Sequence, residues 1–357
     1  MDFEQNNNMS EPPTYPPGGA QQEPPEPIPA MARGGTGTAQ RPKKRTGWRV
    51  FWGIVLVLSV LANIMLFLMV IGVVAMFAAG QRGIFTEEVI QKGPRATKIA
   101  VIRLEGIINN ERAQDVYLQL KRAREDKHVK GLILRVNLPG GTISGSDQIY
   151  NEIRHKTDKP VVAFMQGMAA SGGYYTSVGC DKIVAEPTTI TGSVGVIMSY
   201  LVLQELLEGK LGIQPVIIKS GEKKDWPSSF RPPTEEQLQY LQEKLIIPAY
   251  NRFVQIVDEG RPMLTLNDVK RLADGSIYGA KEAVDEKLID KIGYLDDAIE
   301  QVKSLADIEE AQVVEYRKPF RLADFLNSRS RNILRIDKTT LYELSTPQLL
   351  YLWTIRE

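Results

Sequence analysis

The order of hydrophobic and polar positions divides the 357-residue chain into three parts. Residues 1–46 are polar and rich in proline, whereas residues 50–81 carry no charged side chain and are almost entirely apolar. From residue 97 onward, short runs rich in valine and isoleucine alternate with segments whose apolar positions recur every three or four residues. This pattern predicts a tail without a core, then one long apolar helix, then a folded domain of strands and helices.

The uncharged run is long enough to cross a membrane. A bilayer core requires roughly 20 apolar residues, so we predict a transmembrane helix over residues 50–80. A signal peptide is the alternative, but its apolar region is about 7–15 residues long and lies near the N-terminus. The run in this chain is longer and begins later, which favours a retained membrane anchor.

Basic residues crowd the N-terminal side of this run: Arg41, Lys43, Lys44, Arg45 and Arg49. The positive-inside rule therefore predicts a cytoplasmic N-terminus and an extracytoplasmic body over residues 82–357. This is the layout of a single-pass protein of the bacterial plasma membrane. Residues 1–46 hold nine of the 21 prolines and are expected to be a disordered cytoplasmic tail, with a polyproline ligand as the less favoured alternative. Residues 82–96 read as a linker.

Strand-like runs alternate with helical patterns over residues 97–306, the expected folded domain. The strand-like runs are TKIAVIRLEGII, GLILRVN, PVVAFMQ, DKIVAEP and PVIIKSG. This alternation predicts an α/β fold with buried, largely parallel strands. A long helix is expected to begin near Thr234 and to kink at Pro248. The extension over residues 307–357 ends in LLYLW, which needs an apolar partner on its own domain or on a neighbouring subunit.

Composition excludes several classes of site. The formal net charge is +1, so nothing suggests a partner nucleic acid. The single cysteine, Cys180, forbids an intrachain disulfide and lies among small apolar residues typical of a buried, unreactive thiol. Two histidines and one cysteine leave no plausible zinc site, and no cofactor is expected.

The stretch MAASGGYY holds a candidate nucleophile, Ser171. It reads as the end of a strand, a tight turn and the start of a helix, with small residues leaving the serine hydroxyl bare. Backbone N–H groups at a helix N-terminus can stabilise an oxyanion, and Gly172 would let a substrate carbonyl approach. An ordinary helix N-cap is the alternative reading of Ser171.

A second glycine turn lies upstream, where PGG follows a strand that ends at Asn137. A tetrahedral intermediate is commonly held by two N–H donors from different loops. Gly141 and Gly172 could form such a pair, although a simple strand-to-helix turn explains the PGG segment equally well.

Neither histidine of the chain is a good candidate for the general base that would deprotonate Ser171. His128 and His155 both stand at charged helix ends that look solvated, so a Ser-His-Asp arrangement has weak support. A neutral lysine can also deprotonate serine, but neutralising it at pH 7 costs about 4.6 kcal/mol, which burial must supply.

Candidate lysines follow the apolar run PVIIKSG: Lys219, Lys223 and Lys224. For each, a solvated surface charge is the more common explanation. Asp225 beside Lys224 is unfavourable for a neutral amine but not decisive. Ser193, between glycines in TTITGSVGVIM, could orient such an amine, and alone it is a weak signal.

Four motifs in one order, after a membrane anchor, carry a resemblance to a known family. They are NLPGG, MAASGGYY, TGSVGV and SGEKKD. Together they make residues 97–304 resemble the signal peptide peptidase A family, membrane-bound bacterial serine peptidases with a Ser/Lys dyad. The resemblance implies a crotonase-like or Clp-protease-like spiral of β-β-α units, here preceded by one transmembrane helix.

Site residues follow from the resemblance position by position. Ser171 matches the nucleophile, Lys224 the general base and Ser193 the serine that hydrogen-bonds the lysine. Gly141 and Gly172 match the backbone donors of the oxyanion hole. Lys223 is the alternative base, because a slip of one residue would exchange it with Lys224.

The chain departs from the family at Leu138, where a serine or threonine often precedes PGG, and this position supplies no catalytic side chain. One copy of the domain resembles the shorter members of the family, which form rings in which one protomer's serine meets a neighbour's lysine. The resemblance thus implies a homo-oligomer, contact with membrane lipid, and remnant signal peptides and other membrane-associated peptides as substrates.

The sequence therefore predicts a membrane-anchored serine endopeptidase that works through an acyl-enzyme. The alternatives are a related membrane protease that cleaves a stomatin-like partner, and a non-catalytic membrane scaffold with a protease fold. An acyl-CoA enzyme of the crotonase type is conceivable on fold alone, but the membrane anchor and the serine argue against it.

Overall fold

The computed structural model describes residues 46–79, 85–319 and 348–354, so most of the expected disordered tail lies outside the described residues. The chain divides into two units, Met1–Val73 and Val74–Glu357. The first contains most of one long helix, and the second contains the folded body.

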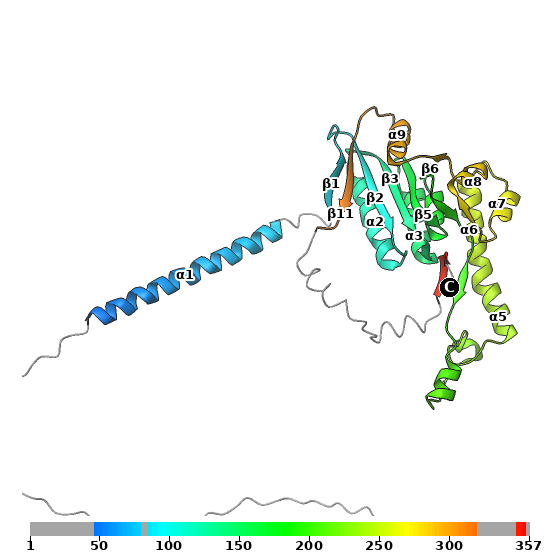
Figure 1. Ribbon diagram of the computed structural model, residues 1–357, viewed down its shortest axis with the longest axis horizontal. Helices are drawn as coiled ribbons and strands as arrows, with labels where there is room; N and C mark the ends of the chain where they lie inside the picture. The colour runs from blue at the N-terminus through cyan, green and yellow to red at the C-terminus, as the bar shows by residue number, and fades with distance from the viewer. Residues whose placement is uncertain (1–45, 80–84, 320–347, 355–357) are drawn as a thin grey trace, which may run out of the picture. The chain divides into compact units, whose positions relative to one another are not determined.

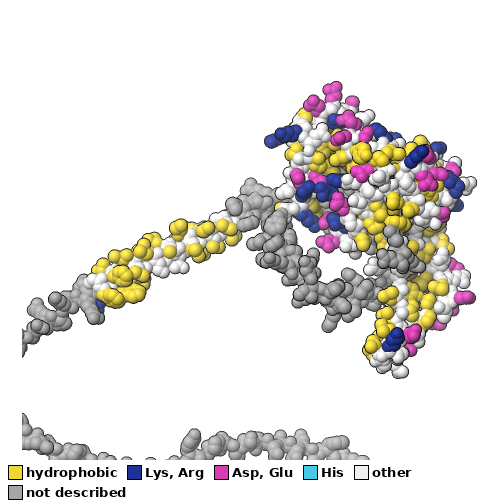
Figure 2. Space-filling view, viewed as in Figure 1, with side chains coloured by type: hydrophobic (Ala, Val, Ile, Leu, Met, Phe, Trp, Pro, Cys, Tyr) yellow, Lys and Arg dark blue, Asp and Glu magenta, His cyan; other side chains and the backbone are white. Residues whose placement is uncertain are grey.

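Helix α1, Thr46–Ala79, is the expected apolar helix. Within its segment Gly47–Val74, an 18-residue window reaches a mean hydropathy of 3.0, and the hydrophobic side chains of this segment are exposed (Figure 2). These 28 residues extend about 42 Å at 1.5 Å per residue, more than the ~30 Å of a bilayer core. The helix is therefore long and apolar enough to cross a membrane.

The body alternates strands with helices (Figure 1). Its strands are β1 Thr86–Gln91, β2 Lys98–Glu105, β3 Val129–Leu138, β4 Gly140–Thr142, β5 Val161–Ala170, β6 Lys182–Ala185, β7 Ile190–Gly192, β8 Ile197–Ser199, β9 Ile277–Gly279, β10 Lys291–Ile292, β11 Gln312–Arg317 and β12 Gln348–Leu352. Its α-helices are α2 Asn110–Glu125, α3 Ile143–Lys156, α4 Gly172–Val178, α5 Glu235–Leu241, α6 Ile247–Gly260, α7 Leu266–Leu272, α8 Ala280–Asp285 and α9 Leu295–Ala306. Three short π- or 3-10-helical segments are η1 Glu205–Lys210, η2 Glu222–Asp225 and η3 Gln242–Ile246.

Among the described residues, the main sheet has nine strands and is mixed. Its order is β1-β11-β2-β3-β5-β6-β10, with β7 paired to the far end of β5 and β9 paired to β7. The strands from β11 to β10 along this order are parallel, and only β1 and β9 pair in the antiparallel sense. The expected α/β fold with a largely parallel sheet is confirmed.

The parallel strands are buried on both faces, which explains their continuous apolar runs. In β2, Ala100, Ile102 and Leu104 belong to the core formed with α2, α3 and α4. The alternate residues Ile99 and Val101 pack instead in a smaller core with α9. Successive side chains of a strand point to opposite faces, so each core takes every second residue.

A second, three-stranded sheet stands beside the C-terminal ends of the parallel strands. Its order is β4-β12-β8, and both pairings are antiparallel. The middle strand, β12, comes from the C-terminal extension, so LLYLW docks on its own chain. The sequence allowed a partner on the same domain or on a neighbouring subunit, and in the structure the partner is the same domain.

Two strands of the main sheet lie outside the range expected for the peptidase domain, 97–306. Strand β1 falls within the expected linker and pairs with β11, which falls within the expected C-terminal extension. Strand β11 in turn lies parallel to β2. Both segments therefore belong to the sheet of the body.

The expected strand at PVIIKSG does not form within the described structure. Residues 211–220 contain no helix or strand, and Val216 and Ile218 are 85% and 95% exposed. An extended segment without a neighbouring strand cannot form a ladder, so the prediction of a strand at PVIIKSG was wrong. These residues belong to an arm, residues 200–233, that projects from the body beside α5 (Figure 1).

The long helix expected from Thr234 forms and is interrupted as expected near Pro248. Thr234 caps α5 through a capping box with Gln237. The π-helical segment η3 then separates α5 from α6, whose first turn contains Pro248. Proline cannot donate an N–H, which explains the change of hydrogen-bond pattern at this point.

Candidate active site

A cavity of about 420 Å³ contains the two serines singled out from the sequence. It lies where β5 and β7 end and where the second sheet begins. Its lining residues are Ser171, Ser193, Gly195, Val196, Ile197, Tyr250, Ala273, Asp274, Gly275, Leu352, Trp353 and Thr354. The structure therefore brings Ser171 and Ser193 together from segments 22 residues apart.

Ser171 joins β5 to α4 in an unusual backbone conformation. Its φ is 53° and its ψ is −113°, a region that non-glycine residues rarely adopt. Its N–H donates to the carbonyl of Gly192 at 2.8 Å, and its carbonyl accepts from the N–H of Tyr175 at 2.8 Å. Its side chain makes no N-cap hydrogen bond, so the N-cap reading fails and the hydroxyl is left for another task.

The hydroxyl is not bare, contrary to the expectation from the small neighbouring residues. Ser171 is only 1% exposed, because it lies at the floor of the cavity and residues of the C-terminal segment form part of the walls. Small residues remove local side-chain cover but cannot prevent cover by a distant segment.

Gly172, which follows Ser171 in the chain, lies next to Gly141. A Cβ at Gly172 would come within 3.2 Å of the N of Gly141 and 2.6 Å of the Oγ of Ser146. A Cβ at Gly141 would collide with the Ile108 carbonyl oxygen at 2.1 Å. Both positions therefore require glycine, and the start of α4 lies against strand β4 next to Ser171. Neither glycine is among the residues that line the Ser171 cavity. The simple-turn reading of PGG is incomplete, because Gly140 and Gly141 form strand β4.

The three candidate lysines lie in the arm and do not line the cavity. Lys219 forms an ion pair with Asp225 at 2.8 Å, and Arg231 contacts the same carboxylate at 2.8 Å. Hydrogen bonds from Arg231 and Lys219 lower the pKa of Asp225 to about 2. Asp225 is thus occupied by two other cations, which removes the concern that it pairs with Lys224.

Lys223 and Lys224 differ in their surroundings. The Nζ of Lys223 lies over the rings of Trp226 and Tyr240, at 5.0 and 4.4 Å from their centroids. Lys224 is exposed, and within the described part of the chain its side chain has no hydrogen bond, ion pair or aromatic contact. The aromatic contacts occupy Lys223 and leave Lys224 unengaged.

The other titratable candidates lie away from this cavity. His128 and His155 are exposed near the ends of α2 and α3, as expected. Cys180 is buried, and its burial raises the pKa of the thiol, which makes it unreactive as expected. Within residues 46–79, 85–319 and 348–354, no cluster of three or more His, Cys, Asp or Glu side chains is placed to hold a metal ion.

The sequence did not reveal that β12 occupies a groove beside Ser171. This strand pairs with Gly140–Thr142 on one side and with β8 on the other, and Trp353 then donates to the carbonyl of Pro139 at 2.9 Å. Leu352 and Trp353 line the same cavity as Ser171. The signal in the sequence was the apolar segment LLYLW, which indicates that the segment is buried but does not indicate against which part of the protein.

Tyr351 anchors β12 in an aromatic pocket. Its side chain is fully buried, with ring centroids 4.9 Å from Tyr175 and 4.7 Å from Phe253. Its hydroxyl donates to the carbonyl of Ala249 at 2.7 Å. The hydroxyl of Tyr175 lies 2.6 Å from a carboxylate oxygen of Asp147. The second tyrosine of MAASGGYY therefore forms part of a side-chain pocket in the groove.

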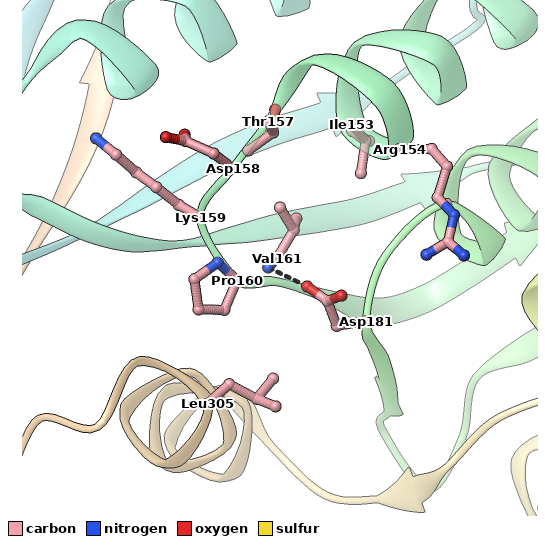
Figure 3. A pocket seen from close by; sticks show the side chains of 10 residues that line it. Ile153, Arg154, Thr157, Asp158, Lys159, Pro160, Val161, Asp181 and Leu305 are labelled. Carbon is pink, nitrogen blue, oxygen red and sulfur yellow. Dashed lines mark hydrogen bonds between the residues drawn. The ribbon is translucent and has the colours of Figure 1, made fainter.

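A different cavity, of about 300 Å³, lies at the opposite ends of the parallel strands (Figure 3). There the carboxylate of Asp181 accepts the N–H of Val161 at 2.8 Å, and the side chain of Lys159, one of the lining residues, extends away from these two residues (Figure 3). The Nζ of Lys159 donates to the carbonyls of Ala123 and Asp126. Asp181 and Lys159 thus stabilise the main chain of the fold. Ligands of open α/β sheets bind at the carboxyl ends of the strands, where the Ser171 cavity lies, and not at the ends where this second cavity lies.

Comparisons with known proteins agree with the geometry. The profile of peptidase family S49 matches residues 153–309, and that of Clp protease matches residues 86–189. A protein from Enterococcus faecium that carries the name signal peptide peptidase SppA is 42% identical over 245 residues, which cover 65% of this chain and 70% of the relative. The chain belongs to peptidase family S49.

Further relatives in this family are longer proteins. Protease 4 from Haemophilus influenzae is 33% identical over 61% of this chain and 36% of its own length. The chloroplast serine protease SPPA of Arabidopsis thaliana is 32% identical over 70% of this chain and 36% of its own length. The chain is thus a serine-type peptidase of family S49 with a Clp-protease-like α/β fold, and the expected family and fold are confirmed. The apolar helix α1 fits a membrane protein.

Proposed function

We propose that this family S49 protein is a membrane-anchored endopeptidase that degrades remnant signal peptides and other membrane-associated peptides through a Ser171/Lys224 dyad. The observation that carries the proposal is Ser171 itself. It stands at the start of α4 with a strained backbone, makes no capping hydrogen bond and lines a cavity with Ser193. Strained residues of this kind cluster at active sites.

The chemistry proceeds through an acyl-enzyme. Lys224, as a neutral amine, takes the proton of the Ser171 hydroxyl while the oxygen attacks the scissile carbonyl carbon. The N–H groups of Gly172 and Gly141 hold the resulting oxyanion. The tetrahedral intermediate collapses as the peptide C–N bond breaks, and the leaving amine takes the proton from Lys224. Water then attacks the ester, gives its proton to Lys224, and Ser171 regains a proton as the acid product leaves.

The position of Lys224 supports a dyad shared between protomers. Neutralising a lysine at pH 7 costs about 4.6 kcal/mol from its reference pKa, and burial is the usual means of offsetting that cost. A second protomer that covers the arm would supply the required burial. Exposed apolar side chains of the arm, including Leu211, Ile213, Val216 and Ile218, favour such a contact.

The groove supports an extended peptide as substrate. Because β12 lies antiparallel to β4 and β8, a substrate segment can pair with the same two strand edges once β12 has left. An apolar segment such as a signal peptide fits the aromatic pocket now filled by Tyr351. We further propose that the N-terminus is cytoplasmic and that residues 82–357 lie outside, where such peptides are released.

The test compares four full-length variants in detergent, with cleavage of a fluorogenic peptide derived from a signal sequence as the readout. Ser171→Ala and Lys224→Ala should lose turnover by at least about 10³-fold, while Lys223→Ala, the matched control, should keep most of it. Ser193→Ala should show a smaller loss, because the lysine is then present but poorly held. Wild-type turnover in Ser171→Ala would refute the proposal, and loss in Lys223→Ala with activity in Lys224→Ala would exchange the bases.

A further inference from the structure

The turn between α7 and β9 forms one wall of the Ser171 cavity. Ala273, Asp274 and Gly275 line the cavity together with Ser171 and Ser193. The N–H of Ser276 donates to the Oδ1 of Asp274 at 2.9 Å, and Gly275 has a φ of 90°. An aspartate that accepts from the residue two positions on closes an Asx turn and fixes its path.

This turn holds Ser193 by its main chain. The N–H of Ser193 donates to the carbonyl of Ser276 at 2.7 Å. Ser193 has a φ of 52°, a sparsely populated conformation that persists only where the surroundings hold it. Ile277, which follows Ser276 and begins β9, pairs with Gly192 of β7.

The same segment also holds Ser171. The N–H of Ser171 donates to the carbonyl of Gly192 at 2.8 Å. The contacts therefore form a chain: Asp274 fixes Ser276, and the carbonyl of Ser276 holds the N–H of Ser193. The peptide bond joins Ser193 to Gly192, whose carbonyl in turn holds the N–H of Ser171. Both serines of the cavity depend on the 192–193 segment, and Asp274 lies at the far end of that chain of contacts.

Asp274 is suited to act as a charged acceptor. Hydrogen bonds from the side chain and the backbone N–H of Ser276 lower the pKa of its carboxyl group, so it is ionised at neutral pH. Hydrogen bonds to an ionised acceptor are stronger than those between neutral groups. A side chain without an acceptor at this position would leave the turn free to move.

We propose that Asp274 is a positioning residue of the peptidase reaction: it fixes the 274–276 turn, whose Ser276 carbonyl holds Ser193 where its hydroxyl receives the general-base lysine. The inference rests on the proposed function, because it assigns the lysine-orienting role to Ser193. Asp274 itself takes no part in bond making or proton transfer.

The test uses Asp274→Ala, Asp274→Asn and a matched control, Asp268→Ala, in the full-length protein. Asp268 closes the N-terminus of the neighbouring helix α7 by accepting the N–H of Thr265 at 3.0 Å, and it has no link to Ser193. Asp274→Ala should lower kcat about tenfold with KM unchanged, as expected when one hydrogen bond that fixes the turn behind Ser193 is lost. Asp274→Asn should recover most of kcat, because an amide oxygen can accept the same N–H.

Asp268→Ala should keep the wild-type kcat while its melting temperature falls about as much as that of Asp274→Ala. The inference is overturned by a wild-type kcat in Asp274→Ala, by an equal loss of kcat in Asp268→Ala, or by a loss in Asp274→Asn as large as in Asp274→Ala.

Labelling of Ser171 by a fluorophosphonate distinguishes a failure of the positioning role of Asp274 from a failure of the proposed peptidase function. If Ser171→Ala is inactive and unlabelled while Asp274→Ala matches wild type, only the positioning role fails. If Ser171→Ala still cleaves peptide, the proposed function fails whatever Asp274 does.

Discussion

A mixture of two inactive variants should regain activity if the dyad is shared between protomers. Each chain carries one Ser171, which lines the cavity, and one Lys224, which lies in the exposed arm outside it. Ser171→Ala keeps an intact lysine, and Lys224→Ala keeps an intact serine. Co-assembly of the two variants can therefore create a site with both groups, whereas neither variant alone can.

The magnitude follows from this separation of the two groups. In a ring, each site takes its serine from one protomer and its lysine from the next. In an equal, random mixture, about one half of the protomers at each place are of the required kind, so about one quarter of the sites are complete. A dyad formed within one chain would give no complete site in this mixture.

A second mixture provides the matched control: wild type with the double variant that lacks both groups. A shared dyad again requires two intact neighbours and gives about one quarter of wild-type turnover. A dyad within one chain requires a single intact protomer and gives about one half. For a ring of many subunits, in which selection for mixed assemblies hardly changes these fractions, the two mixtures together distinguish the two arrangements.

The assay uses co-expressed chains with two different affinity tags, purified through both so that only mixed assemblies remain. Turnover of a fluorogenic peptide is measured per mole of protomer in detergent. Background turnover in the first mixture, combined with about half of the wild-type value in the second, would refute the shared dyad. Recovery that rises with tag-purified mixed assembly supports it.

Three further predictions concern the groove, the oxyanion region and the acid stability of the fold. Deleting residues 348–357 should lower KM for peptide about tenfold or more, since a tethered occupant of the groove is removed, while loss of the buried β12 should lower stability by about 3 kcal/mol in urea unfolding; an unchanged KM would contradict this. Gly172→Ala should lower kcat about 100-fold with the fold intact by circular dichroism, because its Cβ would press on the Oγ of Ser146 at 2.6 Å and displace the backbone. Burial raises the pKa of Asp290, but the hydrogen bond from the buried Arg261 outweighs it and the pKa is lowered, so the pair's stabilisation is present above about pH 4 and is lost as the pH falls through the lower folded value. Arg261→Met should cost about 3–5 kcal/mol near pH 7 and flatten this acid dependence, and equal pH profiles for both proteins would disprove the assignment.

Much of the fold was readable because its signals are local. The strand–turn–helix path around Ser171, the capping of α5 at Thr234 and its interruption before Pro248 all depend on residues close in sequence. The continuous apolar run of β2 identified a strand buried on both faces. The motif order placed Ser171, Ser193, Gly141 and Gly172, and the structure gathers these residues at one end of the sheet.

What the sequence missed depends on pairing between distant segments. The β4-β12-β8 sheet pairs residues about 150 to 210 positions apart, and no local pattern in LLYLW identifies such partners. The run PVIIKSG shows the converse: among the described residues no neighbouring strand pairs with it, and its strand propensity gives no strand. The burial of Ser171 and the Asp274 turn escaped prediction for the same reason, since each depends on a segment that returns from elsewhere in the chain.

The second sheet also has a consequence for inhibitor chemistry. Because β12 runs antiparallel to both of its neighbours, the two edges of the groove hold this occupant in one polarity, and a ligand designed on β12 should keep that polarity. The backbone N–H groups of the occupant alternate between the two edges along the strand. A peptidomimetic for this groove should therefore tolerate N-methylation at few positions, and its electrophile must follow the residue that fills the place of Tyr351 rather than precede it. Reversed-sequence peptides of the same composition offer the corresponding non-binding reference compounds.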